Sequence, residues 1–265
     1  MADLTTLLND LAAKNAKVTE GITLAEGLAA LGALSARGEV RVPEDCNTLD
    51  KAVERVHGDY RLTTIIVGEG EHEIDGDYLE ISSAMRIVGD PEVPREEIVI
   101  VGGIEFNKGI GMCHLQRLTL RSGGAGVFGW SSFTMKDVLV EKCGEFGVGA
   151  WGTGVVGRCT NVEVRQCRGS GVVAQWGASI TLSGPKTTVH HNCTNGLGGD
   201  YGLVVAYNTS TIQLVFPLTI EQVSFDIGGG GDLGAAMGAS TDQIGTKKNA
   251  AKKNPEKKAP NLRFF

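Results

Sequence analysis

A degenerate repeat runs through the middle of the chain and constrains its fold more than any other feature. The segments Met135–Trp151 and Cys159–Trp176 each contain a Val-x-Val strand, a cysteine three residues on, and a Gly-Val strand that leads to a tryptophan. The unit is echoed upstream in Leu118–Trp130 and downstream in Cys193–Tyr207. Units of about 20–30 residues built from short strands and glycine turns stack into a solenoid, because one unit cannot bury its apolar face alone. The repeat therefore predicts an all-β solenoid.

The composition agrees with this fold class. The chain has 265 residues, of which 38 are glycine, about twice the usual share. A solenoid needs corners on every coil, and glycine adopts the backbone conformations that corners require. No run of about 18 apolar residues is present, so we expect no membrane span. The N-terminus has no basic segment followed by an apolar run, which predicts an intracellular protein without a signal peptide.

The pattern changes near both ends of the repeat region and predicts three parts. Residues 1–38 show leucines at helical spacing and are expected to form a helical N-terminal extension. Residues 39–230 are expected to form the solenoid, with a capping helix at about 48–57 that covers the first coil. The glycine run at 228–231 ends the pattern, and residues 231–265 are expected to be a flexible tail. Residues 247–265 carry a net charge of +6 against −6 for the whole chain. This basic tail favours solvation over nucleic-acid binding, which we expect to be weak at most.

The inward positions of the repeat predict the core. The expected core valines and leucine are Val127, Val138, Val148, Val162, Val172 and Leu203. Cys143 and Cys167 share one repeat position, and Cys193 is expected to join them. Stacked strands lie about 4.8 Å apart, so these thiols should form an internal ladder of small buried side chains.

Two segments resemble a known group of proteins. Residues 42–49 lead from a strand into a capping helix, and residues 63–72 run from a strand into a Gly-x-Gly turn. Together with the repeats from Leu118 to Val215, they resemble the pectin-lyase-like right-handed parallel β-helix superfamily. More narrowly, the chain is similar to uncharacterised right-handed β-helix repeat proteins of algae and other protists. The resemblance implies a single-stranded right-handed parallel β-helix with an N-terminal helical cap. It covers both enzymes and non-catalytic modules, so it does not imply one function.

Enzymes of that superfamily act on uronate polymers through clustered charged side chains. The outward positions of the Val-x-Val strands carry acids and bases in alternation, and no stack of aspartates is present. One cluster remains: His190, His191, Asp200 and Tyr201. Such a set could abstract and return a proton at a sugar carbon. A polysaccharide lyase or epimerase that uses these four residues is therefore the alternative to a non-catalytic function. The sequence indicates no metal site and no cofactor.

The aromatic residues are the second candidate site. All three tryptophans of the chain, Trp130, Trp151 and Trp176, follow the Gly-Val strands of successive repeats, and Tyr207 continues the series. Alternation places Trp130 and Trp151 opposite the preceding valines, whereas Trp176 comes one residue later, which predicts a bulge or corner there. The pattern is compatible with an outward strip or a buried stack. An outward strip would suit a sugar face or a protein interface.

These features favour a non-catalytic β-helix scaffold or binding module. Its partner would be a protein or a carbohydrate that lies along one face and contacts Trp130, Trp151, Trp176 and Tyr207. A third interpretation is a structural subunit of a larger assembly, in which the N-terminal extension and residues 262–265 serve as docking elements. The sequence favours the absence of enzymatic activity because no cluster of paired carboxylates appears on the repeats.

Overall fold

The computed structural model describes residues 38–195, 200–225 and 233–247. The chain divides into two units, Met1–Gly38 and Glu39–Phe265, and the second unit contains the solenoid. Residues 1–37 of the predicted helical extension, and residues 248–265 of the predicted tail with its suggested docking element, lie outside the described residues. The described part of the second unit is an all-β solenoid of about six coils.

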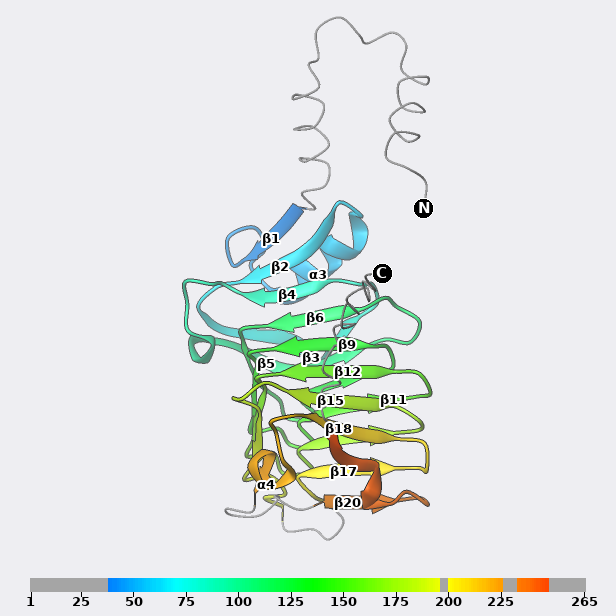
Figure 1. Ribbon diagram of the computed structural model, residues 1–265. Helices are drawn as coiled ribbons and strands as arrows, with labels where there is room; N and C mark the ends of the chain where they lie inside the picture. Colours follow the sequence, from blue (N-terminus) through cyan, green and yellow to red (C-terminus); the bar gives the residue numbers. More distant parts are fainter. Residues whose placement is uncertain (1–37, 196–199, 226–232, 248–265) are drawn as a thin grey trace, which may run out of the picture. The chain divides into compact units, whose positions relative to one another are not determined.

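The strands form three faces, and most coils contribute one strand to each face (Figure 1). The first face is a nine-stranded parallel sheet in the order β1-β2-β4-β6-β9-β12-β15-β18-β21. Its strands are β1 (Gly38–Val42), β2 (Leu62–Val67), β4 (Arg86–Gly89), β6 (Cys113–Gln116), β9 (Phe133–Lys136), β12 (Val156–Thr160), β15 (Ser179–Ser183), β18 (Thr211–Val215) and β21 (Ile244–Lys247).

The other two faces meet at one long strand, β5 (Ile98–Phe106), which β3 (Gly70–Ile81) pairs along its length. The second face consists of β7 (Thr119–Arg121), β10 (Leu139–Glu141), β13 (Glu163–Arg165), β16 (Thr188–His190) and β19 (Ser224–Phe225). The third face consists of β8 (Val127–Gly129), β11 (Val148–Trp151), β14 (Val172–Gln175), β17 (Leu203–Ala206) and β20 (Leu233–Ala236). The short helices η1 (Arg95–Glu97), α4 (Ile220–Val223) and η2 (Thr241–Gln243) lie between strands.

The predicted capping helix is confirmed as α3 (Leu49–Gly58). Thr48 is its N-cap, and the hydroxyl group accepts a hydrogen bond from the backbone N–H of Lys51. This bond satisfies one of the four N–H groups that have no partner inside a helix. The buried residues of α3 are Leu49, Ala52, Val53 and Val56, the four apolar positions that the sequence places on one face. The helix thereby covers the apolar end of the first coils.

The core consists of inward rows that run from coil to coil. Val127, Val148, Val172 and Leu203 are in register on adjacent strands, and each is fully buried. Val138 and Val162 are also buried, so the predicted core is confirmed. Corner positions after the third-face strands are equally regular. Gly152, Trp176, Tyr207 and Met237 all have positive φ.

The predicted cysteine ladder is wrong in its third member. Cys143 and Cys167 are buried free thiols, but Cys193 is only half-buried. The residue that continues the ladder is Asn192, which is fully buried. Its Oδ1 accepts from the Cys167 N–H at 3.1 Å, and its Nδ2 donates to the Val164 carbonyl at 3.1 Å. Cys193 stands one residue later, at a positive φ of 59°.

The solenoid also extends past its predicted end at residue 230. β20 pairs with β17 and β21 pairs with β18, so one more coil reaches Lys247. The glycine run before β20 does not end the stacking. The sequence of β20, Leu-Gly-Ala-Ala, and that of β21, Ile-Gly-Thr-Lys, have few large apolar residues. Their weak alternation explains why the sequence predicts a tail there.

Candidate ligand-binding site

The four predicted aromatic residues lie on the outside of the solenoid, along one edge of the third face. We call Trp130, Trp151, Trp176 and Tyr207 the aromatic strip. Trp176 is 43% exposed, and the other three are half-buried. In β11 the neighbours Val148 and Ala150 fill the core with no exposed surface, so Trp151, one residue after Ala150, points outward. The structure thus selects the outward strip over the buried stack.

The residues of the aromatic strip occupy two different positions of the repeat. Trp151 is paired in register with Gln175, so Trp176 occupies the next position, a corner with φ of 52°. Tyr207 occupies the same corner on the following coil, with φ of 70°. The predicted corner at Trp176 is therefore confirmed. The rings nevertheless contact one another: Trp130 stacks on Trp176 at a centroid distance of 5.4 Å, and Trp176 lies 6.0 Å from Tyr207.

Two further rings, Phe128 and Phe146, adjoin the strip and are not predicted from the sequence. Trp151 lies 5.5 Å from Phe128 and 5.0 Å from Phe146 between ring centroids. Its indole ring folds back over Gly149, where a Cβ atom would come within 1.9 Å of the ring. The only signal for these rings in the sequence is that Phe146 directly precedes a Gly-Val strand.

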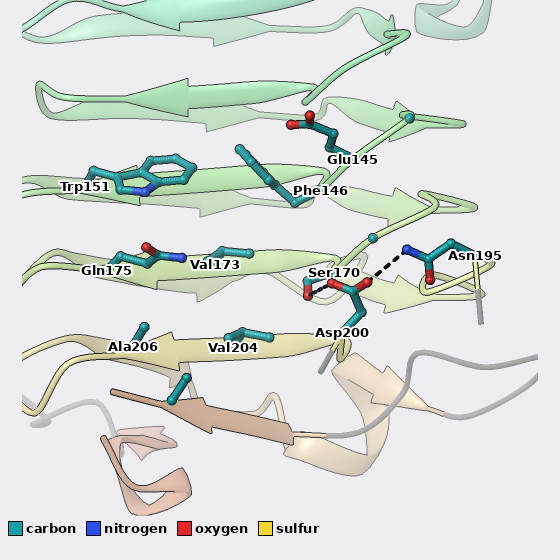
Figure 2. A pocket seen from close by; sticks show the side chains of 13 residues that line it. Glu145, Phe146, Trp151, Ser170, Val173, Gln175, Asn195, Asp200, Val204 and Ala206 are labelled. Atoms are coloured by element: carbon teal, nitrogen blue, oxygen red, sulfur yellow. Dashed lines mark hydrogen bonds between the residues drawn. The ribbon is translucent and has the colours of Figure 1, made fainter. Parts of the chain in front are cut away.

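A groove of about 430 Å³ opens beside these rings on the third face (Figure 2). Its apolar walls and floor come from Phe146, Trp151, Val173, Val204, Ala206 and Ala236. The floor residues belong to β14, β17 and β20, so the groove crosses three consecutive coils. Figure 2 shows Val173 and Val204 between two ends, one with Trp151, Gln175 and Ala206 and the other with polar side chains.

The polar end of the groove is organised around the carboxylate of Asp200. The Ser170 hydroxyl donates to Oδ1 at 3.1 Å, and the Asn195 amide donates to Oδ2 at 3.0 Å. The Tyr201 backbone N–H in turn donates to the Ser170 hydroxyl at 3.2 Å. Glu145 lines the same end and is exposed. The groove therefore has two carboxylates close to its apolar floor.

The structure separates the four predicted catalytic residues into two sets. The ring nitrogens Nδ1 of His190 and His191 lie 2.6 Å apart, and Nε2 of His190 lies 3.4 Å from Oε1 of Glu163. Burial lowers the pKa of His190, although Glu163 acts in the opposite direction. Asp200 instead binds Ser170 and Asn195 in the groove, and the Tyr201 ring lies over Gly234. The histidines thus belong to the second face, and Asp200 to the third.

The charged positions of the second face pair with one another. Glu141 is only 3% exposed, and its carboxylate accepts from Arg121 at 2.8 Å and from Arg165 at 2.7 Å. Arg165 also binds Glu163 at 2.8 Å, and Glu163 binds Arg95 at 3.1 Å. We call these five residues the ion-pair ladder. The second face thus has the mixture of acidic and basic side chains that the sequence predicts, and these side chains form ion pairs with one another.

No family model, curated protein or solved structure matches the chain. Within residues 38–195, 200–225 and 233–247, no three His, Cys, Asp or Glu side chains are grouped so that they could hold a metal ion. In the same part of the chain, no helix has the length and apolar character needed to cross a membrane.

Proposed function

We propose that the chain is a non-catalytic β-solenoid binding module that engages a protein or carbohydrate partner along its third face. The observation that carries this proposal is the outward aromatic strip, in which rings from successive coils contact one another on the surface. Large aromatic rings offer much contact area at a low cost in conformational entropy, and they are enriched where proteins bind partners. The adjoining groove adds polar groups that could fix the orientation of a ligand.

The separate positions of the histidines on the second face and Asp200 on the third face argue against the alternative of a polysaccharide lyase or epimerase. Proton transfer needs the acid and the base within hydrogen-bond reach of one substrate position. His190 lies beside Glu163 and His191, whereas Asp200 accepts hydrogen bonds from Ser170 and Asn195 in the groove. The geometry therefore supports a non-catalytic binding module better than an enzyme that uses the two histidines together with Asp200.

We also propose that the chain is related to the pectin-lyase-like superfamily. The stacked parallel coils and the helix that covers the first coil support this relationship. Because one fold hosts many activities, the relationship adds nothing to the choice of ligand.

The test is a binding screen of the full chain against neutral glycans, polyuronates and peptides. It includes Trp176→Ala and a matched control, Tyr60→Ala, since Tyr60 is 90% exposed and follows α3, away from the strip. We expect at least one ligand whose affinity falls about tenfold in Trp176→Ala and is unchanged in Tyr60→Ala. Ligands that bind both variants equally, or a polyuronate product whose formation His191→Ala abolishes, would overturn the proposal.

A further inference from the structure

The groove on the third face combines an apolar floor with an acidic end. Val173 and Val204 form the middle of the floor, and Glu145 and Asp200 lie at one end with Ser170 and Asn195 (Figure 2). From Val204 to Ala206 the floor spans two residues of β17, about 6.6 Å along the strand. A ligand that follows the floor toward the acidic end must therefore be apolar along its length and polar at its tip.

The described residues that line the groove leave its two carboxylates without a neighbouring cation. Among its described lining residues, Glu145 and Asp200 are charged, and none is a lysine, arginine or histidine. The two hydrogen bonds to Asp200 come from neutral groups, a hydroxyl and an amide. This differs from the second face, where arginines neutralise Glu141 and Glu163. The acidic end is thus complementary to a positive charge.

The aromatic rings of the groove add to this complementarity. Phe146 lines it beside Glu145, whereas Trp151 lines the opposite end (Figure 2), and the face of an aromatic ring attracts a cation that lies within about 6 Å. A carboxylate pair beside an aromatic ring is a combination that binds ammonium or guanidinium groups. A neutral sugar would leave the two carboxylates without a charged partner.

We infer that the groove receives the side chain of a lysine or arginine from a partner protein, an inference that rests on the proposed binding function. The apolar stem of four carbons in lysine, or its counterpart in arginine, lies over Val173 and Val204. The charged head reaches Glu145 and Asp200 at the acidic end. The aromatic strip then contacts the surface of the partner around this side chain.

The experiment measures fluorescence anisotropy of labelled Gly-Ser peptides that contain a single lysine, arginine, citrulline or norleucine, with the full chain. Citrulline keeps the shape of arginine without its charge, and norleucine keeps the stem of lysine. The variants are Glu145→Gln, Asp200→Asn and the matched control Glu54→Gln, an exposed carboxylate on α3. Because Asp200 also organises Ser170 and Asn195, the exposed Glu145 gives a second test that does not disturb this arrangement.

We expect the lysine and arginine peptides to bind about tenfold more tightly than the norleucine and citrulline peptides. This preference should disappear in Glu145→Gln and Asp200→Asn, persist in Glu54→Gln, and weaken as salt is raised. Equal binding of charged and uncharged peptides, no binding of the charged ones, or an unchanged preference in both groove variants would overturn the inference. The proposed function would survive that result if another ligand still depended on Trp176, so the two proposals can fail separately.

Discussion

The indole rings of Trp130 and Trp176 stack at a centroid distance of 5.4 Å with their planes inclined by 27°. These residues follow β8 and β14, which are separated by β11, so their backbones lie about 9.6 Å apart. The rings meet for two reasons. Trp151 on the intervening coil folds back over Gly149, and Trp176 extends from a corner with positive φ. The surface of the strip thus depends on a glycine and a corner as well as on its aromatic residues.

The contact of the Trp151 ring with Gly149 leads to the first prediction. We expect Gly149→Ala to lower the free energy of unfolding by about 1–3 kcal/mol, because the added methyl group overlaps the indole ring and displaces it. Urea unfolding measures the loss, and tryptophan emission reports the displaced ring. The matched control is Gly123→Ala, where a Cβ atom would meet open space. Equal stability and unchanged emission in both variants would show that the ring does not need this glycine.

Glu141 in the ion-pair ladder leads to the second prediction. Burial raises the pKa of its carboxyl group, but the hydrogen bonds from Arg165 and Arg121 lower it by more, so the pKa lies below the ordinary value. A carboxyl group with a lowered folded-state pKa stabilises the fold above its ordinary pKa of about 4.3 and loses that contribution as the pH falls further. Wild-type stability should therefore decline as the pH falls below about 4.3.

The variant Glu141→Gln tests this account. It should lose about 2 kcal/mol at pH 7, since its hydrogen bonds to charged groups are lost or weakened. It should also show a shallower decline in stability as the pH falls below about 4.3. Denaturant unfolding at several pH values measures both effects, with Glu54→Gln as the control. An acid dependence as steep as that of the wild type would contradict the role of Glu141.

Asn192 leads to the third prediction. Its amide bonds to the buried backbone groups of Cys167 and Val164, and Asn192→Ala removes both of these hydrogen bonds. We expect a loss of about 3 kcal/mol in the free energy of unfolding. The control is Asn208→Ala at an exposed position, which should lose much less. An equal loss in the free energy of unfolding in the two variants would contradict a stabilising role of the hydrogen bonds from Asn192 to the preceding coil.

The sequence predicts the parts of this molecule that follow from alternation and misses those that depend on single corner residues. The valine rows and the four apolar positions of α3 follow from the periods of strand and helix, so they could be predicted. The prediction of the third member of the cysteine ladder rests on residue type and not on spacing. Asn192 follows Val189 by three residues, as Cys143 follows Val140 and Cys167 follows Val164, so Asn192 lies in the core and Cys193 lies one residue beyond it.

The candidate site shows the same division. Repetition reveals the aromatic strip, but only the structure shows that Trp151 pairs with Gln175 and that Trp176 occupies the next position. The groove is invisible in the sequence, since Glu145, Ser170 and Asp200 come from three separate coils and corners. His190, His191, Asp200 and Tyr201 are close in sequence, which suggests one cluster. In the structure the two histidines lie together on the second face, and Asp200 binds Ser170 in the groove of the third face.

The most direct test of the binding face uses the fact that all three tryptophans of the chain belong to the strip. An NMR spectrum of the full chain with tryptophan that is isotope-labelled at the indole nitrogen alone shows only the three indole N–H signals, so it reports on this surface alone. A ligand from the binding screen is titrated into the sample while its affinity is measured independently by calorimetry. We predict that the indole signals shift along the same saturation curve as the heat of binding. A ligand that saturates the protein by calorimetry and leaves all three signals unchanged would contradict the assignment of the aromatic strip as the binding surface.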